Sequence, residues 1–365
     1  MLTQFTARIL KKTKMALPTS TRQWILAREP SGAPILSGPS ATWTLITADI
    51  PALQDGQILG RVKYISNDPG QRGFIENFVA PERMYVPTVP IGSPMRAGVI
   101  VDVLASRAPS IAPGSTVMNI HLGLWAEHVV LAAADCQPLA PVPGIPVTHF
   151  LGALGAPGLT GYYGVVEVAR ARPAHTLVVS GAGGSTGSMV VQVAKKLVGC
   201  RRVVGIAGSE DKCAWVRGLG ADACVNYKAP TFVEDLRAAT EGEVDVYFDN
   251  VGGAVLDAVL ARMKKGGTVA VCGAISTYNS TEPMGLRNWF EVISMRLNLK
   301  GLILLDYMDE IPAAIGKLVQ AVQEGKIVLG EESETVVETG IEGVPETWMK
   351  LFDGFNRGKL ITKLV

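Results

Sequence analysis

The segment from Thr176 to Lys212 constrains the fold more than any other part of the chain. An apolar strand at Leu177–Ser180 leads into a glycine-rich turn, an amphipathic helix is expected over Ser188–Leu197, and a second apolar strand covers Arg202–Ala207. This order is typical of the first crossover of a parallel sheet. A helix that starts at glycines presents free N–H groups to a phosphate, so the segment predicts a dinucleotide site.

Four glycines of the turn have separate tasks in such a site. Gly181 allows the tight turn after the strand, Gly183 and Gly184 let the backbone approach the phosphates, and Gly187 lets the helix pack on the sheet. A glycine cluster alone is weak evidence, and the spacing departs from strict Gly-x-Gly-x-x-Gly. The strand before the turn and the helix after it support the interpretation.

The end of the second strand indicates which dinucleotide binds. An NAD site places an acid about 20 residues beyond the turn, whereas this strand is followed by Ser209 and Lys212. Both could bind a 2′-phosphate and Tyr227 could close over the adenosine end, which favours NADPH. The structural alternative makes Ser209 a helix cap, the two acids after it dipole partners, Lys212 a solvated residue and Tyr227 a rim tyrosine.

Composition excludes several other classes of protein. The 365 residues suffice for two domains, the formal net charge is +1, and no apolar run approaches the ~20 residues of a membrane helix. We therefore expect a small-molecule substrate rather than a nucleic-acid or membrane partner. The cysteines form no Cys-x-x-Cys pair, which fits a reducing, cytoplasmic compartment; they are Cys136, Cys200, Cys213, Cys224 and Cys272.

Residues 1–14 differ from the rest of the chain. They contain Arg8, Lys11, Lys12 and Lys14 and no acid. A mitochondrial presequence has this composition. We favour a disordered extension or an alternative start, because Met15 begins a plausible chain.

The apolar runs divide the remainder into two domains. Residues 15–150 contain short β-like runs among Pro and Gly, which is typical of an irregular antiparallel β domain. Strands alternate with helices from 151 to 327, which predicts a doubly wound α/β domain, and residues 328–365 are expected to complete the first domain. The parallel strands are expected at Leu177–Ser180, Arg202–Ala207, Ala223–Asn226, Val244–Asp249, Thr268–Cys272 and Leu297–Leu302.

Zinc ligands are scarce in the first domain. Residues 1–135 contain no cysteine and only His121 and His128. Zinc sites combine several thiolates and imidazoles, and two histidines seven apart are usually structural. We therefore expect no metal.

Together with the glycine turn, five further motifs carry a family resemblance. They are Gly155-Ala-Pro-Gly-Leu-Thr-Gly-Tyr-Tyr-Gly164, Val204-Gly-Ile-Ala-Gly-Ser-Glu-Asp-Lys212, Val225-Asn-Tyr-Lys228, Tyr247-Phe-Asp-Asn-Val-Gly-Gly253 and Cys272-Gly-Ala-Ile-Ser-Thr-Tyr-Asn279. They resemble the prostaglandin/leukotriene reductase and 2-alkenal (double-bond) reductase family, a zinc-free branch of the medium-chain dehydrogenases/reductases. The resemblance implies a GroES-like antiparallel β domain, a Rossmann domain with a six-stranded parallel sheet, NADPH, and a homodimer.

The resemblance also implies roles for individual residues. The pyrophosphate would contact Gly183 to Thr186, including Ser185, and Lys212 and Tyr227 would hold the 2′-phosphate end. The remaining implied coenzyme contacts run from the middle of the coenzyme to the nicotinamide; they are Asn250, Cys272, Gly273, Ala274, Ile275, Ser276, Leu302, Ile303, Leu304 and Asn356.

Members of that family reduce the C=C bond of α,β-unsaturated ketones and aldehydes, which requires a hydrogen-bond donor on the carbonyl oxygen. Tyr278 is the candidate, because it follows the strand Thr268–Cys272 at the carboxyl edge of the sheet, where such folds bind ligands. The alternative is an exposed loop tyrosine. Whether Tyr278 protonates Cα or only orients the substrate stays open.

The substrate segment departs from the family pattern. Where the family often has Asp-Pro-Tyr-Met-Arg, this chain has Gly70 and Gln71 after Asp68 and Pro69, which indicates a roomier or more polar pocket. Asp68 is expected to form a turn, and Arg72 an ion pair rather than a substrate contact. The substrate candidates are Tyr64, Met95 and Arg96, with Trp125 beside them and plain packing as the alternative.

Three functions remain from the sequence. The first is NADPH-dependent reduction of an activated C=C bond. The second is a dehydrogenase, ketone reductase or quinone reductase in a specialised-metabolite pathway, although an alcohol oxidation without zinc lacks a Lewis acid for the alkoxide. The third is a non-catalytic NADPH-binding protein.

Overall fold

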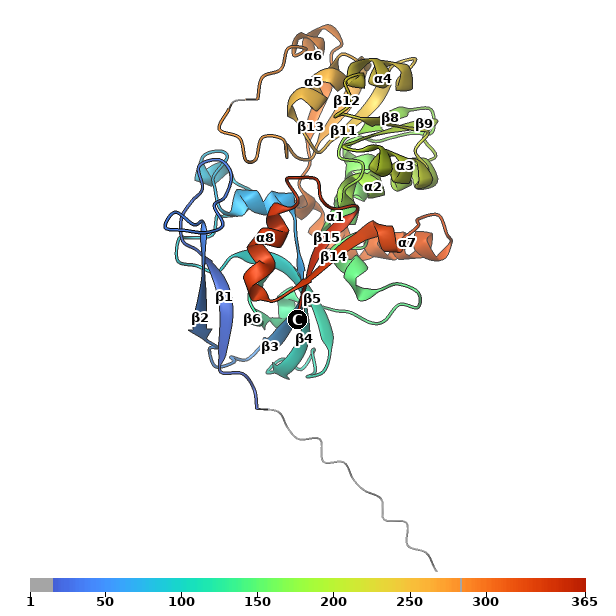
Figure 1. Ribbon diagram of the computed structural model, residues 1–365. Helices are drawn as coiled ribbons and strands as arrows, with labels where there is room; N and C mark the ends of the chain where they lie inside the picture. The colour runs from blue at the N-terminus through green and yellow to red at the C-terminus, as the bar shows by residue number, and fades with distance from the viewer. Residues whose placement is uncertain (1–15, 283) are drawn as a thin grey trace, which may run out of the picture.

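A computed structural model describes residues 16–282 and 284–365. The predicted extension at residues 1–14 lies outside the described residues. The chain forms two domains, with the parallel sheet in one and the antiparallel strands in the other (Figure 1). An α/β fold with these two sheets confirms the predicted fold class.

The coenzyme domain contains a six-stranded parallel sheet in the order β10-β9-β8-β11-β12-β13. This is the doubly wound order 3-2-1-4-5-6 of dinucleotide-binding domains. The two middle strands, β8 and β11, are adjacent although the chain between them forms β9 and β10. The strands are β8 (Thr176–Val179), β9 (Arg202–Ala207), β10 (Ala223–Asn226), β11 (Val244–Asp249), β12 (Met263–Val271) and β13 (Asn298–Gly301).

Helices cover both faces of the central strands of this sheet, and this covering buries β8 on both sides. Leu177 and Val179 of β8 share one core with α1, α2 and α7, whereas Val178 faces α4 and α5. This alternation follows from the two-residue period of a strand. The helices are α1 (Ala156–Tyr163), α2 (Ser185–Gln192), α3 (Glu210–Gly218), α4 (Phe232–Ala239), α5 (Gly253–Leu260), α6 (Phe290–Ser294) and α7 (Ile311–Gln323).

The first domain is built around a second sheet in the order β14-β15-β3-β4-β5-β7, with β6 also paired to β3. Its strands are β3 (Gln57–Ser66), β4 (Arg96–Ser106), β5 (Thr116–Leu124), β6 (His128–Ala132), β7 (Gln137–Pro138), β14 (Glu334–Thr339) and β15 (Lys359–Leu364). The C-terminal return therefore joins the sheet of the first domain. One pair departs from the antiparallel prediction, because β14 and β15 run parallel.

Two strands of the first domain escaped the sequence analysis. β1 (Ser20–Leu26) and β2 (Trp43–Asp49) form a separate antiparallel pair. Trp43 of β2 packs against Trp125 and Trp348 of α8 (Val344–Met349), with ring centroids 5.3 and 5.6 Å away. Most of the other residues of β1 and β2 are half-buried or exposed, so these strands lack a continuous apolar run.

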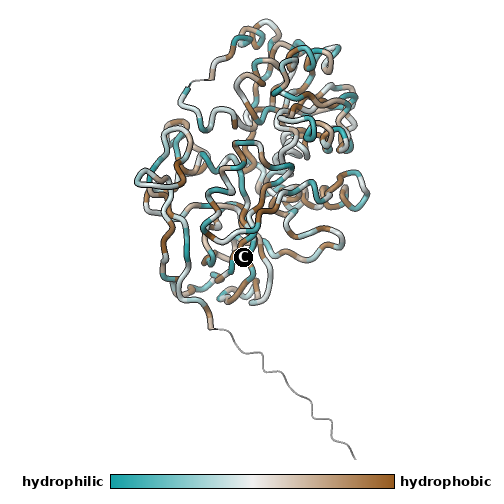
Figure 2. The backbone as a smooth tube through the Cα atoms, viewed as in Figure 1, coloured by the Kyte–Doolittle hydropathy of each residue, from teal (hydrophilic) through white to brown (hydrophobic). Residues whose placement is uncertain are grey.

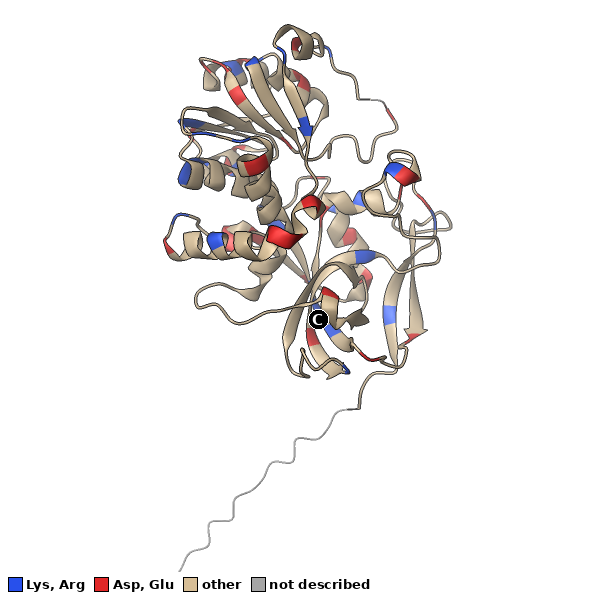
Figure 3. Cartoon of the chain, turned by 180° about the vertical axis from the view of Figure 1, so that it is seen from behind, with Lys and Arg blue, Asp and Glu red and all other residues tan. Residues whose placement is uncertain are grey.

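The surface shows no dominant charge. Hydrophobic segments follow the strands inside both domains (Figure 2). Acidic and basic residues are interspersed on the face seen in Figure 3. In the described part of the chain, no helix is long and apolar enough to cross a bilayer.

Candidate active site

The glycine turn has the geometry that a pyrophosphate requires. Gly181 has a φ of +60°, a conformation that glycine adopts without strain. A Cβ on Gly187 would lie 2.2 Å from the carbonyl oxygen of Gly181, so only glycine allows α2 to start this close to β8. The turn therefore brings the first N–H groups of α2 to the carboxyl edge of the sheet, and these residues fit a dinucleotide.

Ser209 and Lys212 follow β9. The structure shows the helix cap expected of Ser209 in the structural alternative, but it does not show the solvated Lys212 of that alternative. Ser209 caps α3, since its Oγ accepts a hydrogen bond from the Lys212 N–H at 3.3 Å. The Lys212 side chain is not a free surface residue, because its Nζ donates to the Gly354 carbonyl at 2.7 Å. Burial, with smaller effects of Lys228 and Arg357, lowers the pKa of Lys212.

Tyr227 and the turn glycines line the same end. The hydroxyl of Tyr227 lies 3.2 Å from the position that a Cβ on Gly208 would take, and 42% of the tyrosine is exposed. The aliphatic part of Lys212 similarly lies 3.1 Å from a Cβ built on Gly183. Both glycines thus allow close packing at the predicted 2′-phosphate end.

Asn250 connects the end of β8 to the loop that is predicted to flank the nicotinamide. Its side chain donates to the Ser180 carbonyl at 2.7 Å, and its own carbonyl accepts from Ile275 N–H at 3.3 Å. Next to it, buried Asp249 accepts hydrogen bonds from Ser180, Tyr247 and two backbone N–H groups. Asp249, which the sequence analysis missed, therefore holds the loop after β11 in place.

The predicted nicotinamide loop folds around Tyr278. The N–H of Ala274 donates to the Tyr278 hydroxyl oxygen at 3.2 Å. Among the described residues nothing accepts the phenol hydrogen, so it is free to donate. Burial raises the pKa of Tyr278, and burial raises the pKa of the neighbouring Cys272 thiol to about 12. Both groups are neutral at pH 7, and Tyr278 is a donor.

The first domain adds two aromatic residues that the sequence analysis missed. Phe78 stacks on Tyr278, with ring centroids 5.2 Å apart and planes at 14°. Tyr85 is 52% exposed, and desolvation raises its pKa, with a smaller effect of Cys272. Residues 69–85 therefore lie over the loop at 272–279. No periodic pattern marks this segment, whose only elements are two short 3-10 helices.

Arg72 is a second link between the domains. Its guanidinium is fully buried, pairs with Glu76, and donates to Gly32 carbonyl at 2.7 Å and to Asn279 Oδ1 at 3.1 Å. This agrees with the predicted ion pair rather than with a substrate contact. The bond to Asn279 fixes the position of the loop that carries Tyr278.

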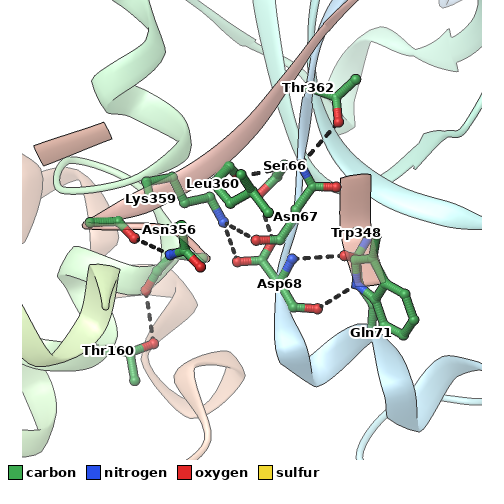
Figure 4. Close-up of polar contacts among 12 residues, drawn as sticks. Ser66, Asn67, Asp68, Gln71, Thr160, Trp348, Asn356, Lys359, Leu360 and Thr362 are labelled. Atoms are coloured by element: carbon green, nitrogen blue, oxygen red, sulfur yellow. Dashed lines mark hydrogen bonds and ion pairs between the residues drawn. The ribbon is translucent and has the colours of Figure 1, made fainter. Parts of the chain in front are cut away.

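Asp68 forms the turn expected of it and a buried ion pair that was not expected. It pairs with Lys359 of β15, whose side chain is 2% exposed and whose Nζ also donates to the Asn67 carbonyl at 2.9 Å (Figure 4). The Asp68 N–H donates to Gln71 Oε1 at 2.8 Å. Gln71 is thus turned inward, and at Gly70 a Cβ would meet nothing within 4 Å.

The other substrate candidates differ in burial, although Met95, Arg96 and Trp125 are neighbours: the Trp125 N–H donates to the Met95 carbonyl at 2.9 Å. Met95 and Trp125 are fully buried in the core of the first domain, so packing is the role that the structure shows. Arg96 lies 4.9 Å from the Phe74 ring, and burial lowers its pKa. Tyr64 lies on β3, partly buried against the core that extends into the coenzyme domain.

Four further coenzyme candidates lie in the C-terminal return and just after β13. Asn356 donates to the Gly358 carbonyl at 2.7 Å, and the Gly358 N–H donates to the Gly183 carbonyl at 2.9 Å. This bond joins the C-terminal return to the glycine turn. Leu302 is buried against α1, whereas Ile303 and Leu304 are half-buried just after β13.

Two family models match the chain. Residues 22–139 match the N-terminal domain of oxidoreductases, and residues 185–320 match the zinc-binding dehydrogenase model. The NADPH-dependent curcumin reductase of Escherichia coli (strain K12) is 35% identical over 94% of this chain and 96% of its own. The chain belongs to the medium-chain dehydrogenase/reductase superfamily. The resemblance found in the motifs is confirmed.

Other relatives place the chain in the same branch. Prostaglandin reductase 1 of Bos taurus is 34% identical over 94% of this chain and 98% of its own. The structure of CurA from Vibrio vulnificus in complex with NADPH superimposes with a TM-score of 0.83 at 33% identity, covering 94% of this chain and 99% of that one. The protein is an NADPH-dependent oxidoreductase of this superfamily.

The matching family model is named for zinc binding, but the side chains that the structure describes do not provide a set of zinc ligands. The matched segment 185–320 contains no histidine. Among the described residues, no three His, Cys, Asp or Glu side chains are placed to share a metal ion. The donor set therefore does not fit a zinc site, and absence of metal stays a prediction for metal analysis.

Proposed function

We propose that this oxidoreductase reduces the C=C bond of α,β-unsaturated ketones or aldehydes without a metal. The observation that carries the proposal is the free phenol hydrogen of Tyr278, in a loop tied to Asn250 beside the glycine turn. NADPH, when bound, supplies the hydride that adds to Cβ. A carbonyl oxygen placed at Tyr278 would accept its hydrogen bond as negative charge develops there.

The surroundings of Tyr278 support this role. Its raised pKa keeps the phenol protonated at neutral pH, and the Ala274 N–H on its oxygen directs the hydrogen away from the loop. Phe78 fixes the ring plane by stacking. A preorganised donor needs little rearrangement when charge forms on the substrate oxygen.

The proposed substrate pocket is open at one wall. Gly70 stands where related chains often have an aromatic side chain, and its neighbour Gln71 donates to the Arg96 carbonyl at 3.1 Å. We therefore expect substrates with a bulky or polar group next to the enone. Tyr85, half-exposed near Cys272, is a candidate for the opposite wall.

Product analysis tests the proposal. The purified enzyme would be incubated with NADPH and a panel of enals, enones, quinones and ketones, and products identified by mass spectrometry and NMR. C=C reduction adds two hydrogens and leaves the carbonyl intact. An allylic alcohol as the product would favour the carbonyl reductase, and NADPH binding without turnover of any compound would favour a non-catalytic role.

We also propose a homodimer in a reducing, cytoplasmic compartment. Strand β13 is the edge of the parallel sheet, and exposed Phe290 and Ile293 of α6 lie just before it. An uncovered edge and apolar side chains suit a second copy. All five cysteines are free thiols. Light scattering should give twice the chain mass, and Phe290→Asp should lower it towards the monomer.

A further inference from the structure

An open hollow lies where α3 meets the C-terminal return. It has a volume of about 390 Å³, with Ser209 and Lys212 on one side and Gly354 and Arg357 on the other. The carboxylates of Asp211, Glu332 and Glu334 also line it. The first pair belongs to the coenzyme domain, and the second precedes β15 of the first domain. The hollow is thus the predicted 2′-phosphate end of the site, and residues of the first domain form its other side.

Arg357 is held in a defined position. Its N–H donates to the Thr335 hydroxyl at 3.1 Å, and that hydroxyl donates back to the Arg357 carbonyl at 2.9 Å. The guanidinium lies 6.0 Å from the ring centre of Trp215. Trp215 is three residues after Lys212 on α3, so both lie on one face of that helix, and Arg357 packs against this face from the first domain.

The two cations interact. The positive charge of Arg357 is one of the causes that lower the pKa of Lys212, after burial and Lys228. Two cations held close together repel each other, and an anion between them removes that repulsion. Phosphate oxygens form short, charge-assisted hydrogen bonds with guanidinium and ammonium groups.

The guanidinium has an exchangeable partner. Arg357 Nη1 lies 2.5 Å from Glu332 Oε1, and their side chains are 32% and 60% exposed. An ion pair this exposed contributes little, so a phosphate dianion can replace the carboxylate. The adjacent Glu334 is committed elsewhere, because it accepts from Thr148 at 2.6 Å and lies 2.9 Å from His149 Nδ1.

We propose that Arg357 is a second cation for the 2′-phosphate of NADPH, beside Lys212, and that Glu332 occupies its guanidinium until the coenzyme binds. The phosphate would then be held by both domains, through Lys212 from one and Arg357 from the other. NADH, which lacks this phosphate, gains nothing from Arg357. The inference does not depend on which substrate the enzyme reduces.

Binding measurements on the full chain test the proposal without turnover. NADPH, NADH and adenosine 2′,5′-bisphosphate would be titrated by calorimetry. Arg357→Gln should raise the Kd of NADPH and of the bisphosphate about tenfold and leave the Kd of NADH unchanged. Glu332→Gln should lower the Kd of NADPH about twofold to threefold, because the competing carboxylate is gone.

Arg217→Gln is the matched control, since Arg217 is an exposed arginine in the last turn of α3, the helix that carries Lys212. The Kd values of NADPH, NADH and the bisphosphate should stay unchanged in this variant. Equal weakening of NADPH and NADH by Arg357→Gln, or no change in either, would overturn the proposal. If Arg357→Gln lowers the unfolding temperature of the coenzyme-free protein, its weaker NADPH binding could come from lost stability. The NADPH affinity of Glu332→Gln then tests the proposal. Tighter NADPH binding then supports the proposal, and unchanged or weaker binding rejects it.

Discussion

The two ends of the coenzyme site are built in different ways. The phosphate end is formed mainly by backbone geometry: Gly181 allows the tight turn, and Gly187 allows α2 to pack close to β8. At the proposed nicotinamide end, side chains from two domains meet, with Phe78 stacked on Tyr278 and Arg72 bonded to Asn279. The first end is specified by contiguous sequence and the second by long-range packing.

The largest effect is expected from a substitution that disturbs the backbone of the glycine turn. In Gly187→Val, Cβ would approach the Gly181 carbonyl oxygen to 2.2 Å and the Ala182 Cα to 2.7 Å, so no rotamer relieves the clash. We expect a loss of ~3 kcal/mol or more in stability or coenzyme binding. Thermal unfolding and NADPH titration by fluorescence would measure both.

Gly218→Ala is the control for that variant. Gly218 lies in α3 and has nothing within 4 Å of its Cβ position. Alanine there should stabilise the chain by up to about 1 kcal/mol and leave NADPH binding unchanged. If Gly187→Val bound NADPH normally, α2 would not approach β8 as described.

This difference explains how much the sequence could predict. Strands β9, β10 and β11 were predicted with their observed ends, because each is a short apolar run with clear boundaries. Ser209 and Lys212 could be singled out because they follow β9 directly, and their contact with the coenzyme stays a prediction. The strands β1 and β2 escaped prediction because their exposed positions interrupt the apolar pattern.

Long-range contacts carry no local signal. Phe78 and Tyr85 lie in a segment without regular strand or helix periodicity, about 200 residues from Tyr278. Lys359 reads as a surface residue of a C-terminal strand, yet its pairing with Asp68 buries it. Met95 shows the converse: its sequence neighbours suggested a cleft, whereas its side chain is in the core.

The next largest effect tests the nicotinamide end. Tyr278→Phe removes the proposed donor and keeps the stack on Phe78. Loss of one oxyanion donor reduces kcat roughly 100-fold or more, and we expect this with an enone while the Kd of NADPH stays within about twofold. Stopped-flow measurement of hydride transfer gives the effect on the chemical step, and NADPH titration gives the effect on the Kd of NADPH. Tyr162→Phe, which removes a hydroxyl bonded to Lys317, is the control.

The pH dependence of that step has a definite sign. Burial raises the pKa of Tyr278 above its usual value, so the phenol keeps its proton through neutral and moderately alkaline pH. Its contribution to kcat should be constant there and lost only as pH rises past the raised value. A fall in kcat centred below pH 9 that disappears in Tyr278→Phe would contradict this.

Replacing the charge at the phosphate end should have a smaller effect. Lys212→Gln removes a charge-assisted bond of about 1.5–3 kcal/mol, which is roughly 10- to 150-fold in the Kd of NADPH. NADH should bind as before. In the native enzyme, the lowered pKa of Lys212 means that NADPH binding weakens with rising pH before an ordinary lysine would lose its charge. Lys265→Gln, at an exposed position of β12, is the control.

The smallest expected effect addresses the contact between the domains. Phe78→Leu keeps the volume roughly constant and removes the stack on Tyr278, which is worth about 0.5–1.5 kcal/mol. Because the stack orients the proposed donor to the substrate carbonyl oxygen, we expect kcat to fall about two- to tenfold. The Kd of NADPH should not change, since the phosphate end is built separately. Phe290→Leu, on exposed α6, should change neither value. Weaker NADPH binding in Phe78→Leu would show that the two ends are coupled, and the contrast between them would then have to be abandoned.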